Sequence, residues 1–355
     1  MSSLTRAPQA DPVHATIWDV AREARTSKST VSKVLRGQPH VAPSTRKRVE
    51  EAIDRLGYRP NAAARSLVQR RAHVLGIVVT DIRNPFFGEI AHAIAEAAGA
   101  AGYSTILSDL SMDRSGASSF LDLVLEGRAD ALVFAAWPAA PGATRRLREA
   151  SFPIAFVGCR PLGGVGADWV AVDEERGVAM AVRHLVELGH RRIACIASAE
   201  DDAADRIAGY RAGLAAAGLD PDDSLVVRAD PSADEADFGS LAGYRAARTL
   251  LGATPRPTAI LAADDFLALG AMQALEESGV LVPRDVSLVG FDDIQFAGLS
   301  RIGLTTIGQP RALMGRRIAE LVLDRLDSRV PSEPRGILLE PTLIVRGSTG
   351  PPGPT

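Results

Sequence analysis

The residues best suited to chemistry lie near the start of the chain, in the stretch TIWDVAREARTSKSTVSKVLRG at residues 16–37. A short helix that turns Val31, Val34 and Leu35 inward presents ammonium, guanidinium and hydroxyl groups on its other face. Such groups donate hydrogen bonds to the edges of DNA bases and to phosphates. The outward set is Lys28, Ser29, Ser32, Lys33 and Arg36.

Positive and negative charge are unevenly distributed along the chain. Residues 1–71 hold 14 Lys and Arg against 6 Asp and Glu, a net charge of +8, whereas the remainder carries -11 and the whole chain -3. A basic segment on an acidic body favours a polyanionic partner for that segment alone. Charge by itself does not separate a nucleic-acid surface from a solvated face.

Three short helices are predicted to hold the basic residues in place. Thr16 and Asp19 form a capping-box pattern before a first helix. Ser27 caps a second helix that Gly37 ends, and Ser44 begins a third helix that stops at Gly57. Two helices joined by a turn of two or three residues predict a helix-turn-helix, whose second helix enters the major groove.

Downstream, short β-like runs alternate with helical patterns at steps of about 25 residues. This alternation predicts parallel sheets covered by helices on both faces, and its two series predict two doubly wound lobes. The fold class is therefore α/β, with an all-α helix-turn-helix headpiece before a two-lobed sensor. The runs begin at Val74, Ser104, Ala131, Ile154, Ile193, Leu225, Ala259 and Val286.

Polar and aromatic residues follow several of these strands, at the edge where doubly wound sheets bind ligands. They are candidates for a site in a cleft between the lobes. An aspartate there can equally cap the next helix, and an aromatic residue can equally belong to the core. The candidates are Asn84, Phe86, Trp137, Arg160, Asp173, Phe238, Asp264 and Asp292.

An ordered set of motifs resembles the lactose/galactose repressor (LacI/GalR) family. The set runs from TIWDVAREA and SKSTVSKVL through TRKRVEEAIDRLGYRPN, NPFFGEI, DRIAGYRAGL and VSLVGFDD to LTTIGQP. The resemblance covers nearly the whole chain and implies a DNA-binding headpiece, a hinge helix and a sensor domain like periplasmic sugar-binding proteins. Arg25 departs from the family, which often has glycine in the turn.

The resemblance also implies roles for headpiece residues. The positions of Lys28, Ser29 and Lys33 face bases, and Leu67 wedges a base step open from the minor groove, a recurrent device for kinking DNA. Alternatively, Leu67 packs on a lobe. The other implied DNA contacts are Thr16, Thr30, Ser32, Arg36, His40, Tyr58, Asn61 and Arg65.

For the sensor, the resemblance implies aromatic or apolar walls at Phe86, Trp137 and Phe238. It implies hydrogen-bonding side chains at Asp173, Asp264 and Asp292. Carboxylates and aromatic faces suit a neutral or cationic polyhydroxy ligand, a sugar first and a nucleoside second. Arg160 is the main counter-evidence, because it can neutralise an acidic site.

The predicted domains are a headpiece at 15–60, a hinge helix at 61–72 and a sensor at 73–346. One lobe takes residues 73–172 and 303–330, and the other takes 173–302 and 331–346. The Gly- and Pro-rich tail, residues 347–355, is predicted to be disordered. The tail lacks a leucine-rich helix of the kind that makes tetramers in the family, so we expect a homodimer.

Composition narrows the alternatives. No apolar run approaches the roughly 20 residues that span a bilayer, and the start lacks a secretory pattern, so we expect a cytoplasmic protein. No P-loop or nucleotide fingerprint is present, and His184 and His190 lack a metal-binding context, so neither cofactor, metal nor catalysis is expected. A transport-type sugar-binding protein and a cytoplasmic α/β enzyme remain the alternatives. The basic segment disfavours the former and the lack of a nucleophile disfavours the latter.

Overall fold

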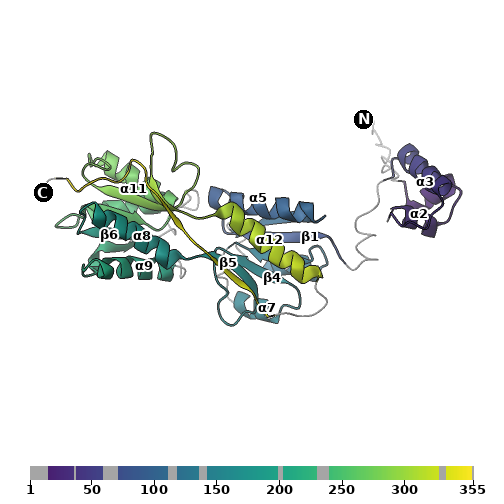
Figure 1. The fold of residues 1–355 in the computed structure, drawn as a ribbon, viewed down its shortest axis with the longest axis horizontal. Helices are drawn as coiled ribbons and strands as arrows, with labels where there is room; N and C mark the ends of the chain where they lie inside the picture. The colour runs from purple at the N-terminus through teal and green to yellow at the C-terminus, as the bar shows by residue number, and fades with distance from the viewer. Residues whose placement is uncertain are drawn as a thin grey trace, which may run out of the picture. The chain divides into compact units, whose positions relative to one another are not determined.

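The computed structural model describes residues 15–35, 37–58, 71–110, 118–135, 142–198, 203–229, 240–327 and 333–353. The chain divides into two compact units, Met1–Ala72 and His73–Thr355 (Figure 1). Each unit has its own hydrophobic core and is described separately.

The headpiece contains α1 (Ile17–Glu23), α2 (Lys28–Leu35) and α3 (Pro43–Leu56). The predicted capping box is confirmed, because the Thr16 hydroxyl accepts from the Asp19 amide and the Asp19 carboxylate accepts from the Thr16 amide. The third helix begins at Pro43, one residue before the predicted start, since proline suits the first helical position.

The core of the headpiece is small and aliphatic. Its buried residues come from all three helices, and the predicted inward residue Leu35 lies outside it, partly exposed at the end of α2. The core of this unit therefore contains few apolar side chains. The buried set is Val20, Ala21, Ala24, Val31, Val34, Val49 and Ala52.

The first lobe is built on a six-stranded parallel sheet in the order β11-β5-β4-β3-β1-β2. Ile77 and Val133 pack in the same core as α5 and α12, whereas Val78 and Phe134 pack with α6 and α7. Alternate residues of each strand thus face opposite helical layers. The elements are β1 (Val74–Val79), α5 (Pro85–Ala100), β2 (Ser104–Asp109), α6 (Ser118–Leu125), β3 (Ala131–Phe134), α7 (Ala143–Glu149), β4 (Ile154–Val157), β5 (Asp168–Val172), α12 (Arg311–Asp327) and β11 (Gly336–Leu339).

The second lobe has a six-stranded sheet in the order β12-β10-β9-β8-β6-β7, in which only β12 is antiparallel. Helices α8 and α9 pack with one set of strand residues, and α10 and α11 with the other. The elements are α8 (Glu174–Glu187), β6 (Ile193–Ala197), α9 (Ala203–Ala216), the 3-10 helix η2 (Asp223–Leu225), β7 (Val226–Arg228), α10 (Ser240–Leu251), β8 (Ala259–Ala262), α11 (Asp265–Glu277), β9 (Ser287–Asp292), β10 (Thr305–Gly308) and β12 (Thr342–Ile344).

The predicted lobe boundaries are wrong near the C-terminus. Strand β10 was expected in the first lobe, but Thr306 pairs with Gly290 of β9 in the second sheet. Strand β11 was expected in the second lobe, but Gly336 pairs with Trp169 of β5 in the first. The chain therefore changes lobes after β5, β10 and β11. Local periodicity identifies a strand but not the distant strand with which it pairs.

The predicted disorder of the tail is also wrong for the described residues 347–353. Ser348 is buried, its hydroxyl donates to the Leu288 carbonyl at 2.6 Å, and the Thr305 amide donates to that hydroxyl at 2.8 Å. The Leu288 amide donates to the Ser348 carbonyl at 2.8 Å. Composition failed as a guide here because these backbone and side-chain bonds to the second lobe order the segment.

Two histidines of the second lobe form hydrogen bonds with the C-terminal segment. His184 Nε2 lies 3.0 Å from Thr349 Oγ1, and His190 Nε2 lies 2.9 Å from the Gly350 carbonyl oxygen. Because a carbonyl only accepts, His190 Nε2 carries the proton, and Nδ1 accepts from Thr258 Oγ1 at 2.9 Å. Burial lowers the pKa of both His184 and His190, so both rings are held neutral.

We expect His190→Ala to lower the free energy of unfolding of the sensor by about 1–3 kcal/mol, because Gly350 and Thr258 lose a buried partner. The wild-type advantage should shrink as the pH falls below about 6.5. The unfolded histidine binds a proton there before the folded one does, so acid favours unfolding. Urea unfolding of both proteins from pH 8 to pH 5 measures this difference. If the difference in unfolding free energy between wild type and His190→Ala does not change with pH, the assignment of a neutral His190 ring is wrong.

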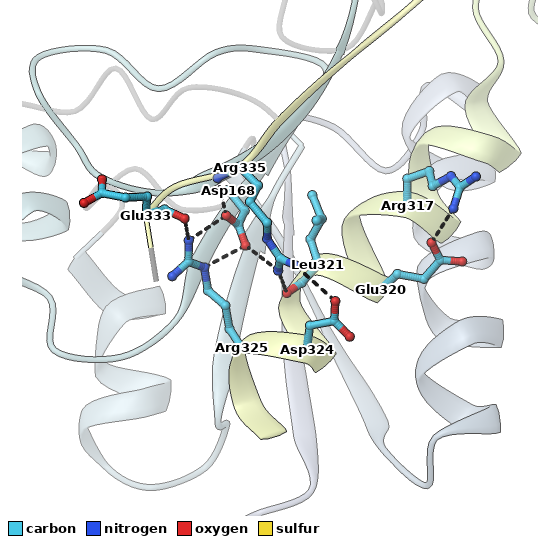
Figure 2. Close-up of polar contacts among 8 residues, drawn as sticks. All are labelled: Asp168, Arg317, Glu320, Leu321, Asp324, Arg325, Glu333 and Arg335. Atoms are coloured by element: carbon cyan, nitrogen blue, oxygen red, sulfur yellow. Dashed lines mark hydrogen bonds and ion pairs between the residues drawn. The ribbon is translucent and has the colours of Figure 1, made fainter. Parts of the chain in front are cut away.

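An ion cluster surrounds the buried carboxylate of Asp168 in the first lobe (Figure 2). The Asp168 carboxylate, with 0% of its side chain exposed, accepts from Arg325 Nε at 2.6 Å and from the Arg335 amide at 2.7 Å. Arg335 also pairs with Asp324 at 3.1 Å. Burial by itself raises the pKa of the Asp168 carboxyl, but the bonds from Arg325 and Arg335 outweigh it and leave that pKa below its ordinary value. The cluster joins β5, α12 and the segment that leads into β11.

Candidate functional site

The first candidate site is the exposed face of α2. Val31 and Val34 are buried, whereas Lys28, Ser29 and Lys33 are exposed. The hydroxyl of Ser27 accepts from the Thr30 amide at 3.2 Å and so caps the helix. A capped amphipathic helix with its donors outward can meet base edges and phosphates.

The turn between α1 and α2 is strained at Arg25, the position where the LacI/GalR family often has glycine. Arg25 has a φ of +47°, in the left-handed region that favours glycine. This conformation costs roughly 1 kcal/mol for a side chain with a Cβ. The turn is closed by the Thr26 amide, which donates to the Ala21 carbonyl at 2.9 Å.

The other predicted DNA contacts differ in their exposure to solvent. Thr16 and His40 are exposed, Thr30 and Ser32 are half-buried, and Tyr58 packs against the headpiece core. Four predicted contacts lie outside the described residues: Arg36, Asn61, Arg65 and Leu67.

The second candidate site lies at the carboxyl edge of the second sheet, around Asp292. This residue ends β9 with a φ of +108° and is 5% exposed. Its carboxylate accepts from Gln309 Nε2 at 2.7 Å, and its carbonyl accepts from the guanidinium of Arg311. Arg311 also binds Glu89 of α5 at 2.8 Å, so one side chain ties Asp292 to the first lobe.

Arg206 lies at the same edge and was not among the residues predicted from the sequence. It comes from α9, its side chain is 19% exposed, and its guanidinium pairs with Glu174 at 2.8 Å. The guanidinium lies 4.3 Å from the centre of the Phe291 ring and donates to the Ala263 carbonyl. The available signal was the first of two arginines among the small and apolar residues of DRIAGYRAGL.

Burial and neighbouring groups shift the pKa values of two carboxyls at this edge, Asp292 and Asp265. Burial raises the pKa of the Asp292 carboxyl well above its ordinary value, whereas the cation of Arg206 lowers it. Burial also raises the pKa of Asp265 to about 7, although Thr306 Oγ1 and the Ile294 amide both donate to its carboxylate. A buried carboxyl beside a guanidinium can accept hydrogen bonds from ligand hydroxyl groups, and its protonated form can also donate one to them.

Three predicted ligand contacts are helix caps. The Asn84 side chain accepts from the Phe86 amide at 3.0 Å, Asp173 from the Arg176 amide at 3.0 Å, and Asp264 from the Leu267 amide at 2.7 Å. The negative charge of Asp264 also raises the pKa of the Asp292 carboxyl. The capping role that the sequence allowed for Asp264 is therefore confirmed.

Two further predicted ligand residues have partners other than Asp292 in the structure. Phe86 is buried in the hydrophobic core and packs edge-on against Phe87 at 5.1 Å. Arg160 is exposed and stacks on Trp169 at 5.1 Å. Trp137 and Phe238 lie outside the described residues.

Two negative findings apply to the part of the chain that the structure describes. It contains no group of three or more histidine, cysteine or acidic side chains that could hold a metal ion. None of its helices is long and apolar enough to cross a membrane.

Comparison with known proteins extends these observations. Residues 16–61 match the family model of bacterial regulatory proteins of the lacI family, and residues 182–349 match that of periplasmic binding protein-like domains. The HTH-type transcriptional regulator GalR of Escherichia coli is 34% identical over 95% of this chain and 96% of its own.

Two solved structures share the architecture. The lac repressor dimer bound to operator and an anti-inducer has a TM-score of 0.81 at 28% identity, covering 95% of this chain and 99% of that chain. The transcriptional regulator CelR in complex with cellobiose has a TM-score of 0.70 at 33% identity, covering 94% of this chain and 99% of that chain.

A helix-turn-helix headpiece followed by two doubly wound lobes defines a class, the ligand-responsive DNA-binding transcription regulators. The family follows from the extent of the matches. This chain belongs to the LacI family of bacterial regulatory proteins. The basic segment of an otherwise acidic chain is thus its DNA-binding headpiece.

Proposed function

We propose that the chain is a repressor that binds a pseudo-palindromic operator as a homodimer, with an affinity set by a small polyhydroxy effector. The observation that carries the sensing role is the buried carboxylate of Asp292 near the guanidinium of Arg206, at the carboxyl ends of parallel strands. Ligands of doubly wound sheets bind at such ends. The effector would lie in the predicted cleft between the lobes.

On the DNA side, Lys28, Ser29 and Lys33 read bases in the major groove, and the predicted hinge places Leu67 in the minor groove. One reading helix contacts only a few base pairs, so two headpieces related by two-fold symmetry are needed for a specific operator. The lac repressor bound to operator is a dimer, which supports this assembly.

The effector is a neutral polyhydroxy compound, with a sugar ahead of a nucleoside. A sugar hydroxyl both donates and accepts, so it can bond to the Asp292 carboxyl and to the Arg206 guanidinium at once. The CelR complex contains cellobiose, a neutral sugar, which supports this class. Asp173 and Asp264 remain predicted contacts, and so do Asn84, Phe86, Trp137, Arg160 and Phe238.

A two-stage experiment tests the proposal. Operator DNA is first selected from a random pool with the full chain. Neutral sugars, nucleosides and sugar phosphates are then screened by thermal shift, because a specific ligand raises apparent stability by mass action. Each hit is added to the operator complex to measure a change in affinity. Tight binding of a sugar phosphate with no response to any neutral compound would contradict the effector class.

We expect operator affinity to fall steeply with salt, because the headpiece region carries a net charge of +8. Five phosphate contacts would lower the affinity on the order of 10²-fold or more between 50 and 200 mM salt. Fluorescence anisotropy with labelled operator measures the slope. An affinity that does not change over this range would mean that counterion release is absent and that the basic region does not bind phosphates.

A further inference from the structure

Trp18 is the most unusual surface residue of the headpiece. It lies on α1, whose residues Val20 and Ala21 build the core, yet 62% of Trp18 is exposed. A tryptophan is a large apolar surface to leave in water, and the described headpiece core does not include it. Most of the ring is therefore available for contacts outside the headpiece core.

The exposed ring has a cationic neighbour on the reading helix. The ammonium nitrogen of Lys28 lies 5.3 Å from the centre of the Trp18 ring, within the range of a cation–π interaction. Lys28 is the first residue of α2, the end of a reading helix that reaches base edges. Helix α1 thus supplies an aromatic face beside the cation that begins α2.

The local electrostatics make this contact useful. A cation at a helix N-terminus is opposed by the helix dipole. Within residues 15–35 and 37–58, no carboxylate forms an ion pair with Lys28, and the nearby Asp19 is paired with Arg22 at 3.1 Å. The negative face of the indole ring is therefore the stabilising partner that the described headpiece offers this ammonium.

We propose that Trp18 is a positioning residue for base readout, acting through Lys28; this rests on the proposed operator binding. A lysine side chain is a flexible point charge, so alone it contacts phosphates and several bases with little discrimination. The ring restricts the ammonium to one side of the reading helix. There it donates to paired acceptors such as O6 and N7 of guanine, the strongest acceptor pattern in the major groove.

The test is a double-mutant cycle on the full chain. Wild type, Trp18→Ala, Lys28→Ala and the double variant are titrated with the selected operator and with its single-base variants. Trp18→Ala should lower discrimination at the base pair that Lys28 reads by about 2- to 5-fold, the range of an exposed cation–π contact. The same change should have no further effect in the Lys28→Ala background.

Two controls separate positioning from a structural role. Trp18→Phe should retain part of the discrimination, because a smaller aromatic face remains. Leu56→Ala removes a partly exposed apolar residue of α3 and should leave discrimination unchanged. Thermal unfolding of Trp18→Ala should match wild type, since the ring is outside the core.

The outcomes are distinguishable. If Trp18→Ala weakens operator and scrambled DNA equally, or acts equally in both Lys28 backgrounds, the positioning role is wrong while operator binding stands. If the wild-type chain selects no DNA sequence at all, the proposed function fails and the positioning role fails with it. Loss confined to one base pair and dependent on Lys28 supports both.

Discussion

Replacing Asp292 with alanine is expected to abolish the response to ligand while operator affinity stays near wild type. The carboxylate is buried at the end of β9, and burial has raised its pKa, so it can exchange hydrogen bonds with a hydroxyl in a poorly solvated place. Removing this buried partner leaves the ligand hydroxyl without a hydrogen bond, which costs about 1–3 kcal/mol, on the order of 10- to 10²-fold in affinity. Isothermal titration with the ligand identified by thermal shift, and anisotropy with operator, measure the two properties separately.

Companion variants show which group acts. Asp292→Asn keeps an oxygen for Gln309 but can neither ionise nor donate an O–H bond, so it should retain the fold and still lose most of the response. Arg206→Lys keeps a cation but loses the paired contact with Glu174, so it should lower the affinity for the same ligand. Asp223→Ala, at an exposed carboxylate of η2, serves as the control. An unchanged ligand affinity in both Asp292 variants would exclude this edge as the effector site.

Part of this site could be predicted from the sequence. Asp292 and Asp264 were selected because each follows a buried apolar run, and parallel strands bring their carboxyl ends to one edge. Arg206 could not be found in this way. It lies within a helix, and only the packing of α9 against the sheet brings its guanidinium over the Phe291 ring.

The fold shows the same division between local and long-range information. Apolar runs predicted most strands of both lobes, since a buried strand is recognised by its own residues. Strand β11 ends at Leu339 and β12 begins at Thr342, with only two residues between them, yet the two strands belong to different sheets. Their partners are fixed by hydrogen bonds to β5 and β10, far away in the sequence. The ordered tail depends likewise on distant partners such as Leu288.

The cluster around Asp168 leads to the second large expected effect. Asp168→Ala should lower the free energy of unfolding of the sensor by about 3–5 kcal/mol, because it leaves Arg325 and Arg335 without their buried counter-charge. Urea unfolding at pH 7, followed by circular dichroism, measures the change. The wild-type advantage should persist at neutral pH and decline below about pH 4, since a carboxyl with a lowered pKa stabilises the folded state only while it is ionised.

Helix α12, which carries Arg325, also provides a matched control for the unfolding measurement. Arg317 and Glu320 of α12 form an ion pair at 2.9 Å, with 51% and 55% of their side chains exposed (Figure 2). Glu320→Ala should change stability by less than about 0.5 kcal/mol, because water already solvates both charges. Equal losses from Asp168→Ala and Glu320→Ala would show that burial does not amplify the Asp168 cluster. A large loss from Asp168→Ala alone would mean that this one carboxylate holds β5, α12 and the chain entering β11 in one lobe.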